Sequence, residues 1–209
     1  MSHYEDEAQV EQLRRWWREN WMALVGGLAL GLAGIFGWEA WQNAQAATAS
    51  RASQLYEDLD KAPADKPDHL KELGQKLVAE YGSTPYAAQG QLLLAQRAVE
   101  RNDFEGAREN LNWVIGHSDD PSLKKVAKLR LARVLWQLGK QDDALAQLGA
   151  TDDDAFASLY QELRGDIQLA RGDRAAAKAA YEKALAAGPA AAGKDTLQRK
   201  LDQLADAKS

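Results

Sequence analysis

The 209-residue sequence contains no cysteine and only three histidines. Without cysteine the chain forms no disulfide, and it has no thiol nucleophile or thiolate metal ligand. His3, His69 and His117 include no pair at metal-ligand spacing, and we expect His69 and His117 to be solvated loop residues. Neither a Gly-Lys-Ser/Thr phosphate loop nor a Gly-x-Ser-x-Gly nucleophile turn occurs. We therefore expect no catalytic residues, no cofactor and no metal site.

An excess of basic charge is also missing. The whole chain has a formal net charge of −5, and residues 42–209 carry 23 Lys and Arg against 25 Asp and Glu. A nucleic-acid-binding domain usually carries a basic face, so we expect no nucleic-acid partner. The acidic run Asp152-Asp153-Asp154 lacks the glycine and terminal glutamate of a calcium loop, and it predicts helix capping instead.

The most prominent feature present is an uncharged run of nineteen residues from Asn20 to Trp38. As a helix it would be ~28 Å long, close to the thickness of the hydrocarbon core of a bilayer. Tryptophans gather at both ends of this run, as in an interfacial aromatic belt; they are Trp16, Trp17, Trp21, Trp38 and Trp41. The pattern predicts a transmembrane helix over residues 20–38, so the chain is expected at a membrane.

The distribution of cations predicts the orientation of this helix. Arg14, Arg15 and Arg18 precede the run, whereas the first cation after it is Arg51. By the positive-inside rule, residues 1–19 form a cytoplasmic tail and the rest of the chain is exported.

A cleaved signal peptide is the alternative, because Ala44-Gln45-Ala46 and Ala47-Thr48-Ala49 both have the small-x-small pattern of a cleavage site. The length of the apolar run and the bulky Trp38-Glu39-Ala40-Trp41 that follows it favour a retained anchor.

Small residues recur along the predicted span, at Ala23, Gly27, Gly31 and Gly34. Their spacing would let another membrane helix approach closely. Glycine is also common in membrane helices without a packing role, so this stripe alone does not decide between the two interpretations.

Beyond the span the sequence predicts an all-α fold, because β-branched residues are few and no alternating strand pattern occurs. Residues 39–62 contain no Pro or Gly, so the membrane helix is expected to continue outward until Pro63. We assign residues 39–68 to a membrane-proximal helix and loop, and residues 69–209 to a helical repeat domain.

Three helix pairs can be aligned on Asn102, Gly139 and Gly172, which are 37 and 33 residues apart. Seven residues before each turn residue the side chain is small, at Ala95, Ala132 and Gly165. Five residues after it the side chain is again small, at Ala107, Ala144 and Ala177. Nine residues after it the side chain is large, at Leu111, Leu148 and Tyr181. This pattern resembles the 34-residue tetratricopeptide repeat. It predicts a right-handed α-solenoid of antiparallel helix pairs, with a degenerate copy around Leu73, Leu77 and Pro85, a capping helix over Lys194–Ala205 and a frayed end at Ala207–Ser209.

The repeat register also predicts a concave partner-binding groove, because the first helix of each pair lines that face in tetratricopeptide arrays. Nine residues take these positions: Leu92, Gln96, Val99, Leu129, Arg133, Trp136, Glu162, Asp166 and Leu169. Such a face suits an extended or helical segment of another protein. Alternatively, Leu92, Leu129 and Leu169 belong to the core and only the polar residues face outward, since a one-residue error in helix phase exchanges the two sets.

Several runs together resemble the YfgM-like family, the ancillary subunit of the Sec translocon in Gram-negative bacteria. They are Tyr4–Glu11, Arg14–Asn20, Phe36-Gly37-Trp38, Leu129–Val134 and Leu163–Asp166. The resemblance covers nearly the whole chain. It implies a single-pass inner-membrane protein with a periplasmic repeat domain, bound to the SecYEG channel and to the parvulin-type chaperone PpiD.

The role implied by the resemblance is to help pass newly exported chains to periplasmic chaperones, with exported client polypeptides as further candidate ligands. We therefore expect a non-enzymatic, membrane-tethered adaptor. The alternative is a structural scaffold of the envelope that self-assembles or organises cell-wall machinery.

Overall fold

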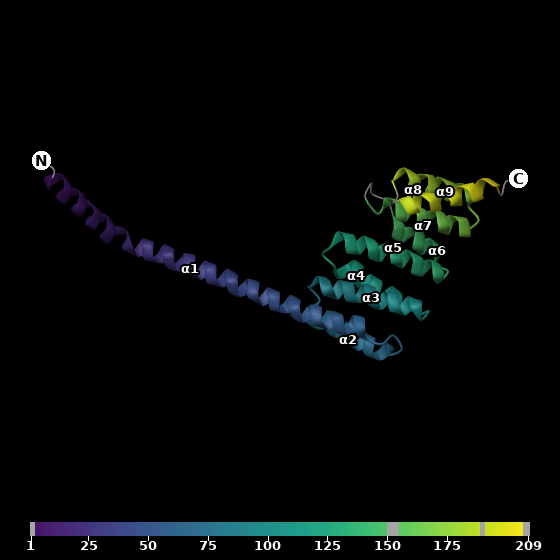
Figure 1. The fold of residues 1–209 in the computed structure, drawn as a ribbon, viewed down its shortest axis with the longest axis horizontal. Helices are drawn as coiled ribbons and strands as arrows, with labels where there is room; N and C mark the ends of the chain where they lie inside the picture. The colour runs from purple at the N-terminus through teal and green to yellow at the C-terminus, as the bar shows by residue number, and fades with distance from the viewer. Residues whose placement is uncertain (1–2, 150–154, 189–190, 207–209) are drawn as a thin grey trace. The chain divides into compact units, whose positions relative to one another are not determined.

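The computed structural model describes residues 3–149, 155–188 and 191–206. These residues form helices and no strand, which confirms the all-α prediction (Figure 1). The helices are α1 His3–Lys61, α2 Pro67–Tyr81, α3 Pro85–Glu100, α4 Phe104–His117, α5 Pro121–Gln137, α6 Gln141–Leu148, α7 Ala157–Ala170, α8 Arg174–Ala186 and α9 Ala191–Asp206. Contacts divide the chain into two units, one up to Ser50 and one that begins at Arg51 and is called the repeat unit below.

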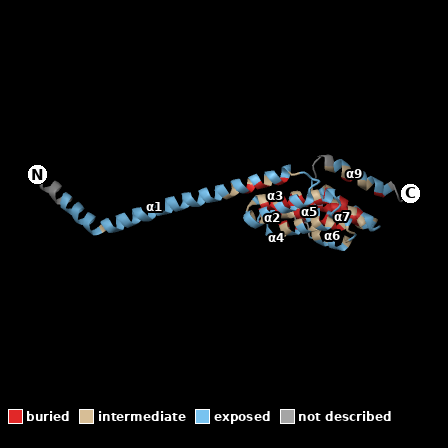
Figure 2. Cartoon of the chain, turned by 90° about the horizontal axis from the view of Figure 1, so that it is seen from below, coloured by how far each residue is buried: buried red, intermediate tan, exposed pale blue. Residues whose placement is uncertain are grey.

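The first unit contains most of helix α1. Among the described residues, α1 is the one helix that is long enough and apolar enough to cross a membrane. No residue of its most apolar stretch is buried. Figure 2 shows this part of α1 as exposed almost throughout. Large apolar side chains from Val10 to Trp41 are exposed, which water disfavours and lipid accommodates. The predicted continuation of the helix beyond Trp38 is confirmed, because α1 ends at Lys61, two residues before Pro63.

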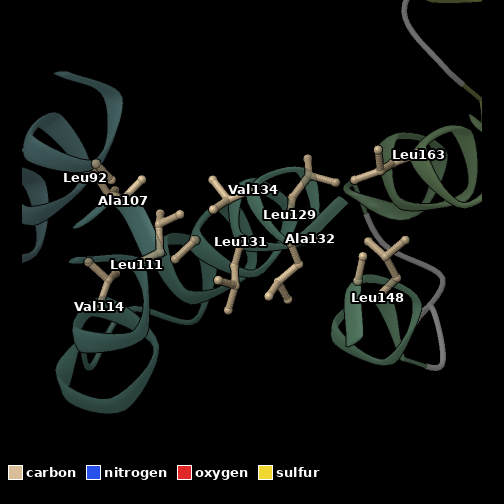
Figure 3. Packing of buried hydrophobic residues seen from close by; sticks show 14 of the residues in the cluster. Leu92, Ala107, Leu111, Val114, Leu129, Leu131, Ala132, Val134, Leu148 and Leu163 are labelled. Atoms are coloured by element: carbon tan, nitrogen blue, oxygen red, sulfur yellow. The ribbon is translucent and has the colours of Figure 1, made fainter. Parts of the chain in front are cut away.

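The repeat unit stacks helix pairs α3/α4, α5/α6 and α7/α8 in chain order (Figure 1). The repeat register is confirmed by burial, because the small and large residues that follow each turn are at most 1% exposed. These residues are Ala107, Ala144 and Ala177, with Leu111, Leu148 and Tyr181. Most of them join one apolar core that extends from α3 to α7 (Figure 3).

The three predicted turn residues end their helices in the left-handed conformation. Asn102, Gly139 and Gly172 have φ angles of 60°, 75° and 84°. At the second turn the Gly139 N–H donates to the Trp136 carbonyl at 2.9 Å, and the Lys140 N–H donates to the Leu135 carbonyl at 2.8 Å. The other two turns repeat this pair of hydrogen bonds, so the same glycine-type helix stop joins each pair.

Helix α2 precedes these three pairs and carries Leu73 and Leu77, around which the sequence predicts a degenerate copy. The last turns of α1 supply buried Ala52, Leu55 and Leu59, which form a cluster with Leu77 of α2 and Leu94 of α3. Helix α1 therefore belongs to the repeat unit from residue 51 onward, inside the segment that the sequence assigned to a membrane-proximal helix and loop.

The predicted capping helix is present as α9, and Leu197 and Leu204 are buried against residues of α8. His69 lies in the first turn of α2 and His117 ends α4. Both histidines are exposed, as expected, but they are helical rather than in loops. Asp152–Asp154 and Ala207–Ser209 lie outside the described residues, so the predicted cap and the predicted frayed end stay predictions.

Candidate partner-binding surface

The predicted groove residues on α3 and α5 separate into two groups. Leu92 and Leu129 are 8% and 6% exposed and belong to the apolar core. Gln96 and Val99 of α3 and Arg133 of α5 are exposed and line the same hollow. The structure therefore brings these three residues together on one surface and withdraws the two leucines from it.

The remaining predicted groove residues lie elsewhere. Trp136 is half-buried against the apolar core, and Leu169 is exposed on α7. Glu162 and Asp166 of α7 are half-buried and bind Lys200, a residue of the capping helix α9. Two of the three predicted groove residues on α7 are thus bound by the chain's own last helix, and the third is exposed.

The hollow between α3, α4 and α5, called the α3–α5 hollow below, has a volume of about 450 Å³. Apolar residues of three helices form part of its lining, namely Ala95, Val99, Phe104, Leu111 and Val134. The other lining residues are polar or charged, namely Gln96, Glu100, Arg130, Arg133 and Gln137. Hydrophobic walls with a few polar groups are the usual arrangement of a binding site, where the walls give affinity and the polar groups give orientation.

The charged side chains around the α3–α5 hollow differ in whether they have a binding partner. Glu100 accepts a hydrogen bond from Gln96 Nε2 at 3.0 Å and lies 3.6 Å from Arg97 Nη1. Arg130 Nη1 donates to the Leu92 carbonyl at 3.5 Å. Among the described residues, the side chain of Arg133 has no hydrogen-bond or ion-pair partner. Within the described part of the chain, the surface therefore presents one acid that is already paired and one cation without a side-chain partner.

At the other end of the array, Lys200 Nζ lies 2.7 Å from Glu162 Oε1 and 2.7 Å from Asp166 Oδ1. Tyr181 OH donates to Asp166 Oδ1 at 2.8 Å. Burial lowers the pKa of Lys200, but its hydrogen bonds to the two carboxylates outweigh this, so the pKa lies above its ordinary value. Burial and the hydrogen bond to Asp166 raise the pKa of Tyr181 far above its ordinary value. These contacts attach α9 to α7 and α8.

Several lining residues were missed by the sequence analysis, above all Arg130 and Phe104. Phe104 begins α4 immediately after a turn, and the repeat register had assigned only first helices to the groove. A signal for Arg130 was present, because residues three apart share one face of a helix and Arg133 was already assigned to the groove.

The predicted packing stripe on α1 is open in this structure. Ala23, Gly27, Gly31 and Gly34 are all exposed. Apart from the adjacent residues and nearby backbone of α1 itself, a Cβ atom added to any of the three glycines would meet no described atom within 4 Å. The role of this stripe in helix packing stays a prediction.

Comparison with known proteins gives a consistent result along the chain. Residues 14–206 match the family described as a tetratricopeptide repeat-like domain. A Haemophilus influenzae protein is 36% identical over 184 residues, which are 88% of this chain and 90% of the relative. An Escherichia coli protein is 35% identical over 206 residues, 98% and 99% of the two chains. A Neisseria gonorrhoeae protein is 29% identical over 206 residues, 97% and 99% of the two chains. Each of the three is named as an ancillary SecYEG translocon subunit.

Proposed function

The chain belongs to the family of ancillary SecYEG translocon subunits, which has a tetratricopeptide repeat-like domain, and from this premise we propose that it is a membrane-tethered adaptor. In this proposal it binds the SecYEG translocon and helps pass exported proteins to periplasmic chaperones without catalysing a reaction. The observation that carries the proposal is the open α3–α5 hollow, whose lining includes exposed Val99 and an Arg133 side chain that is unpaired among the described residues.

The proposed topology follows from charge. Residues 1–19 stay in the cytoplasm, residues 20–38 cross the inner membrane, and the repeat unit lies in the periplasm. Arg14, Arg15 and Arg18 before the span, with no further cation until Arg51, support this orientation.

The membrane tether also supports the adaptor role on energetic grounds. A tethered binding site meets its partner at an effective concentration that reaches the millimolar range for short linkers. Contacts at the α3–α5 hollow that would be weak in free solution can then be sufficient. We assign the face of Ala23, Gly27, Gly31 and Gly34 to a membrane helix of the translocon. We assign the α3–α5 hollow to a PpiD-type parvulin chaperone or to an exported client chain.

Site-specific photocrosslinking in membranes of the native cell tests the proposal. A photoreactive side chain replaces Val99 at the hollow or Gly27 on α1, and the adducts are identified by mass spectrometry. Position 128 is the matched control, since Lys128 is exposed on α5 and does not line the hollow. We expect position 27 to capture a translocon subunit, and position 99 to capture a periplasmic chaperone or an exported chain.

The same experiment reports orientation, because position 99 can reach only proteins on its own side of the membrane. Cytoplasmic adducts at position 99 would contradict the topology. Adducts limited to copies of this chain or to cell-wall enzymes would favour an envelope scaffold over an adaptor.

A further inference from the structure

We propose that the α3–α5 hollow binds an extended segment of another polypeptide in which a bulky apolar side chain is adjacent to an acidic one. This inference rests on the proposed adaptor function and specifies the chemistry of the segment that the adaptor recognises.

The apolar half of the inference comes from the lining of the hollow. Ala95, Leu111 and Val134 are part of the buried core and also line this space. Val99 is 40% exposed, and only two other large hydrophobic residues of the described repeat unit are exposed, Leu159 and Leu169. A volume of about 450 Å³ lies within the range of specific ligand pockets. A bulky apolar side chain would remove Val99 and the surrounding apolar surface from water.

The acidic half comes from the balance of charge. Arg130 and Arg133 line the hollow with one carboxylate, Glu100. Glu100 is already held by Gln96 and lies near Arg97, whereas Arg133 is unpaired among the described residues. A carboxylate beside the apolar side chain would form a charge-assisted hydrogen bond with Arg133. A basic residue at that place would be repelled by both arginines.

The dimensions of the hollow favour an extended chain. Its α5 wall runs from Arg130 to Gln137, a distance of about 10 Å along the helix axis. That length corresponds to about three residues of extended polypeptide. Gln137 lies at one end of the wall, and its side-chain amide makes no hydrogen bond among the described residues. Its amide can therefore donate to and accept from the backbone of a bound segment.

Peptide binding to the full chain in detergent micelles tests the inference. The probe is the fluorescein-labelled peptide Gly-Ser-Phe-Glu-Ser-Gly, and binding is measured by fluorescence anisotropy. One control peptide has Lys in place of Glu, and the other has Ala in place of Phe. We expect the Phe-Glu peptide to bind at least about tenfold more tightly than either control, as the loss of one charge-assisted contact or one apolar anchor would cause.

Two charge-reversal variants locate the binding site. Arg133→Glu should weaken binding of the Phe-Glu peptide at least about tenfold and strengthen binding of the Phe-Lys peptide. Lys128→Glu is the matched control, because it makes the same charge change on the same helix. At 100° per residue, positions 128 and 133 lie about 140° apart around the axis of α5. We expect Lys128→Glu to change the affinity less than about twofold, within the usual effect of a rim charge.

Equal affinities for the Phe-Glu and Phe-Lys peptides would overturn the inference, as would equal losses in the two charge-reversal variants. The photocrosslinking at position 99 separates this failure from failure of the adaptor function. Chaperone or client adducts without a peptide preference would leave the adaptor function in place and remove the acidic specificity. Adducts formed only with copies of this chain would make a second copy the occupant and overturn both.

Discussion

Gly165 of α7 provides the space for the ring of Tyr181 on α8. A Cβ atom added at Gly165 would lie 2.3 Å from Tyr181 Cε1, which is far inside van der Waals contact. The two other copies pair alanine with leucine at these positions, Ala95 with Leu111 and Ala132 with Leu148. The size of one residue is therefore matched to the size of its partner across each helix pair.

We expect Gly165→Ala to lower the free energy of unfolding by about 1–3 kcal/mol, the usual cost of overpacking a core. Adding Tyr181→Leu reproduces the alanine–leucine pair of the other copies and removes the clash. Tyr181→Leu alone also costs stability, because the hydrogen bond to Asp166 is lost. The double variant should therefore be more stable than the sum of the two single effects predicts. Urea unfolding of the four proteins, followed by circular dichroism, measures this coupling.

Strictly additive changes in the free energy of unfolding would show that α7 can move away from α8 to make room for the added methyl group. The close approach of the two helices at Gly165 would then not be required. Gly139→Ala is a useful contrast, because a Cβ there meets no neighbour but the φ angle of 75° still disfavours it. Its effect should not depend on residue 181.

At the scale of single helices, the sequence predicted the turns because their determinants are local. Asn102, Gly139 and Gly172 could be recognised from residue type and spacing alone, and each has the positive φ angle that such residues permit. The buried positions five and nine residues later follow from the same local periodicity. The helical fold and its repeat register could therefore be predicted before any tertiary contact was known.

The phase of the predicted groove was less accurate, for a physical reason. Leu92 and Leu129 were assigned to the groove, but burial of their large apolar side chains turns them into the core. On α5 the exposed lining residues are Arg130, Arg133 and Gln137, so Arg133 was assigned correctly, whereas Leu129 and Trp136 each give way to the next residue. Periodicity gives the spacing of a helix face but not its absolute direction, which depends on the packing of neighbouring helices.

The contact of α9 with α7 could not be predicted from periodicity at all. Lys200 meets Glu162 and Asp166 across 38 and 34 residues of sequence. Glu162 and Asp166 lie on α7 and Lys200 lies on α9, so only the tertiary packing of α9 brings the cation to the two carboxylates. Because these groups are ionisable, we expect the stability of the α9 attachment to depend on pH.

We expect the stability of the α9 attachment to fall at alkaline pH. The folded state raises the pKa of Lys200 above 10.5 and that of Tyr181 above 10.0. A group whose pKa is raised by folding contributes its full stabilisation when the pH is below its ordinary pKa. That stabilisation is lost as the pH rises through the higher pKa of the folded state. The free energy of unfolding of the wild-type chain should therefore be nearly constant from about pH 7 to 9 and decrease above about pH 10.

Two variants isolate this effect from the titration of other residues. Lys200→Met and Tyr181→Phe cannot lose a proton at these positions, so both should show a shallower decrease above pH 10 than the wild type. Lys200→Met should also be less stable at pH 8, because Glu162 and Asp166 lose their cation. Superimposable pH dependence in all three proteins, measured by urea unfolding, would rule out a contribution from this cluster.

At the scale of the whole molecule, one helix takes part in two different environments. From Val10 to Trp41, α1 exposes large apolar side chains and contributes nothing to the described core clusters. From Arg51 to Lys61 the same helix buries Ala52, Leu55 and Leu59 in the repeat unit. The candidate membrane span and the turns of α1 that pack in the repeat unit therefore belong to one continuous helix.

Two truncations separate these roles. Residues 42–209 retain the buried turns of α1, whereas residues 63–209 lose them. We expect the 42–209 chain to be soluble without detergent and to unfold at the temperature of the repeat unit in the full chain.

Loss of buried Leu55 and Leu59 should cost the 63–209 chain about 3–6 kcal/mol, which lowers its melting temperature by at least about 5 °C. In the 42–209 chain, Leu59→Ala should reproduce part of that loss, while Gln54→Ala, at an exposed position of the same helix, should not. Equal melting temperatures for the two truncated chains, measured by circular dichroism, would show that α2 folds onto α3 without α1.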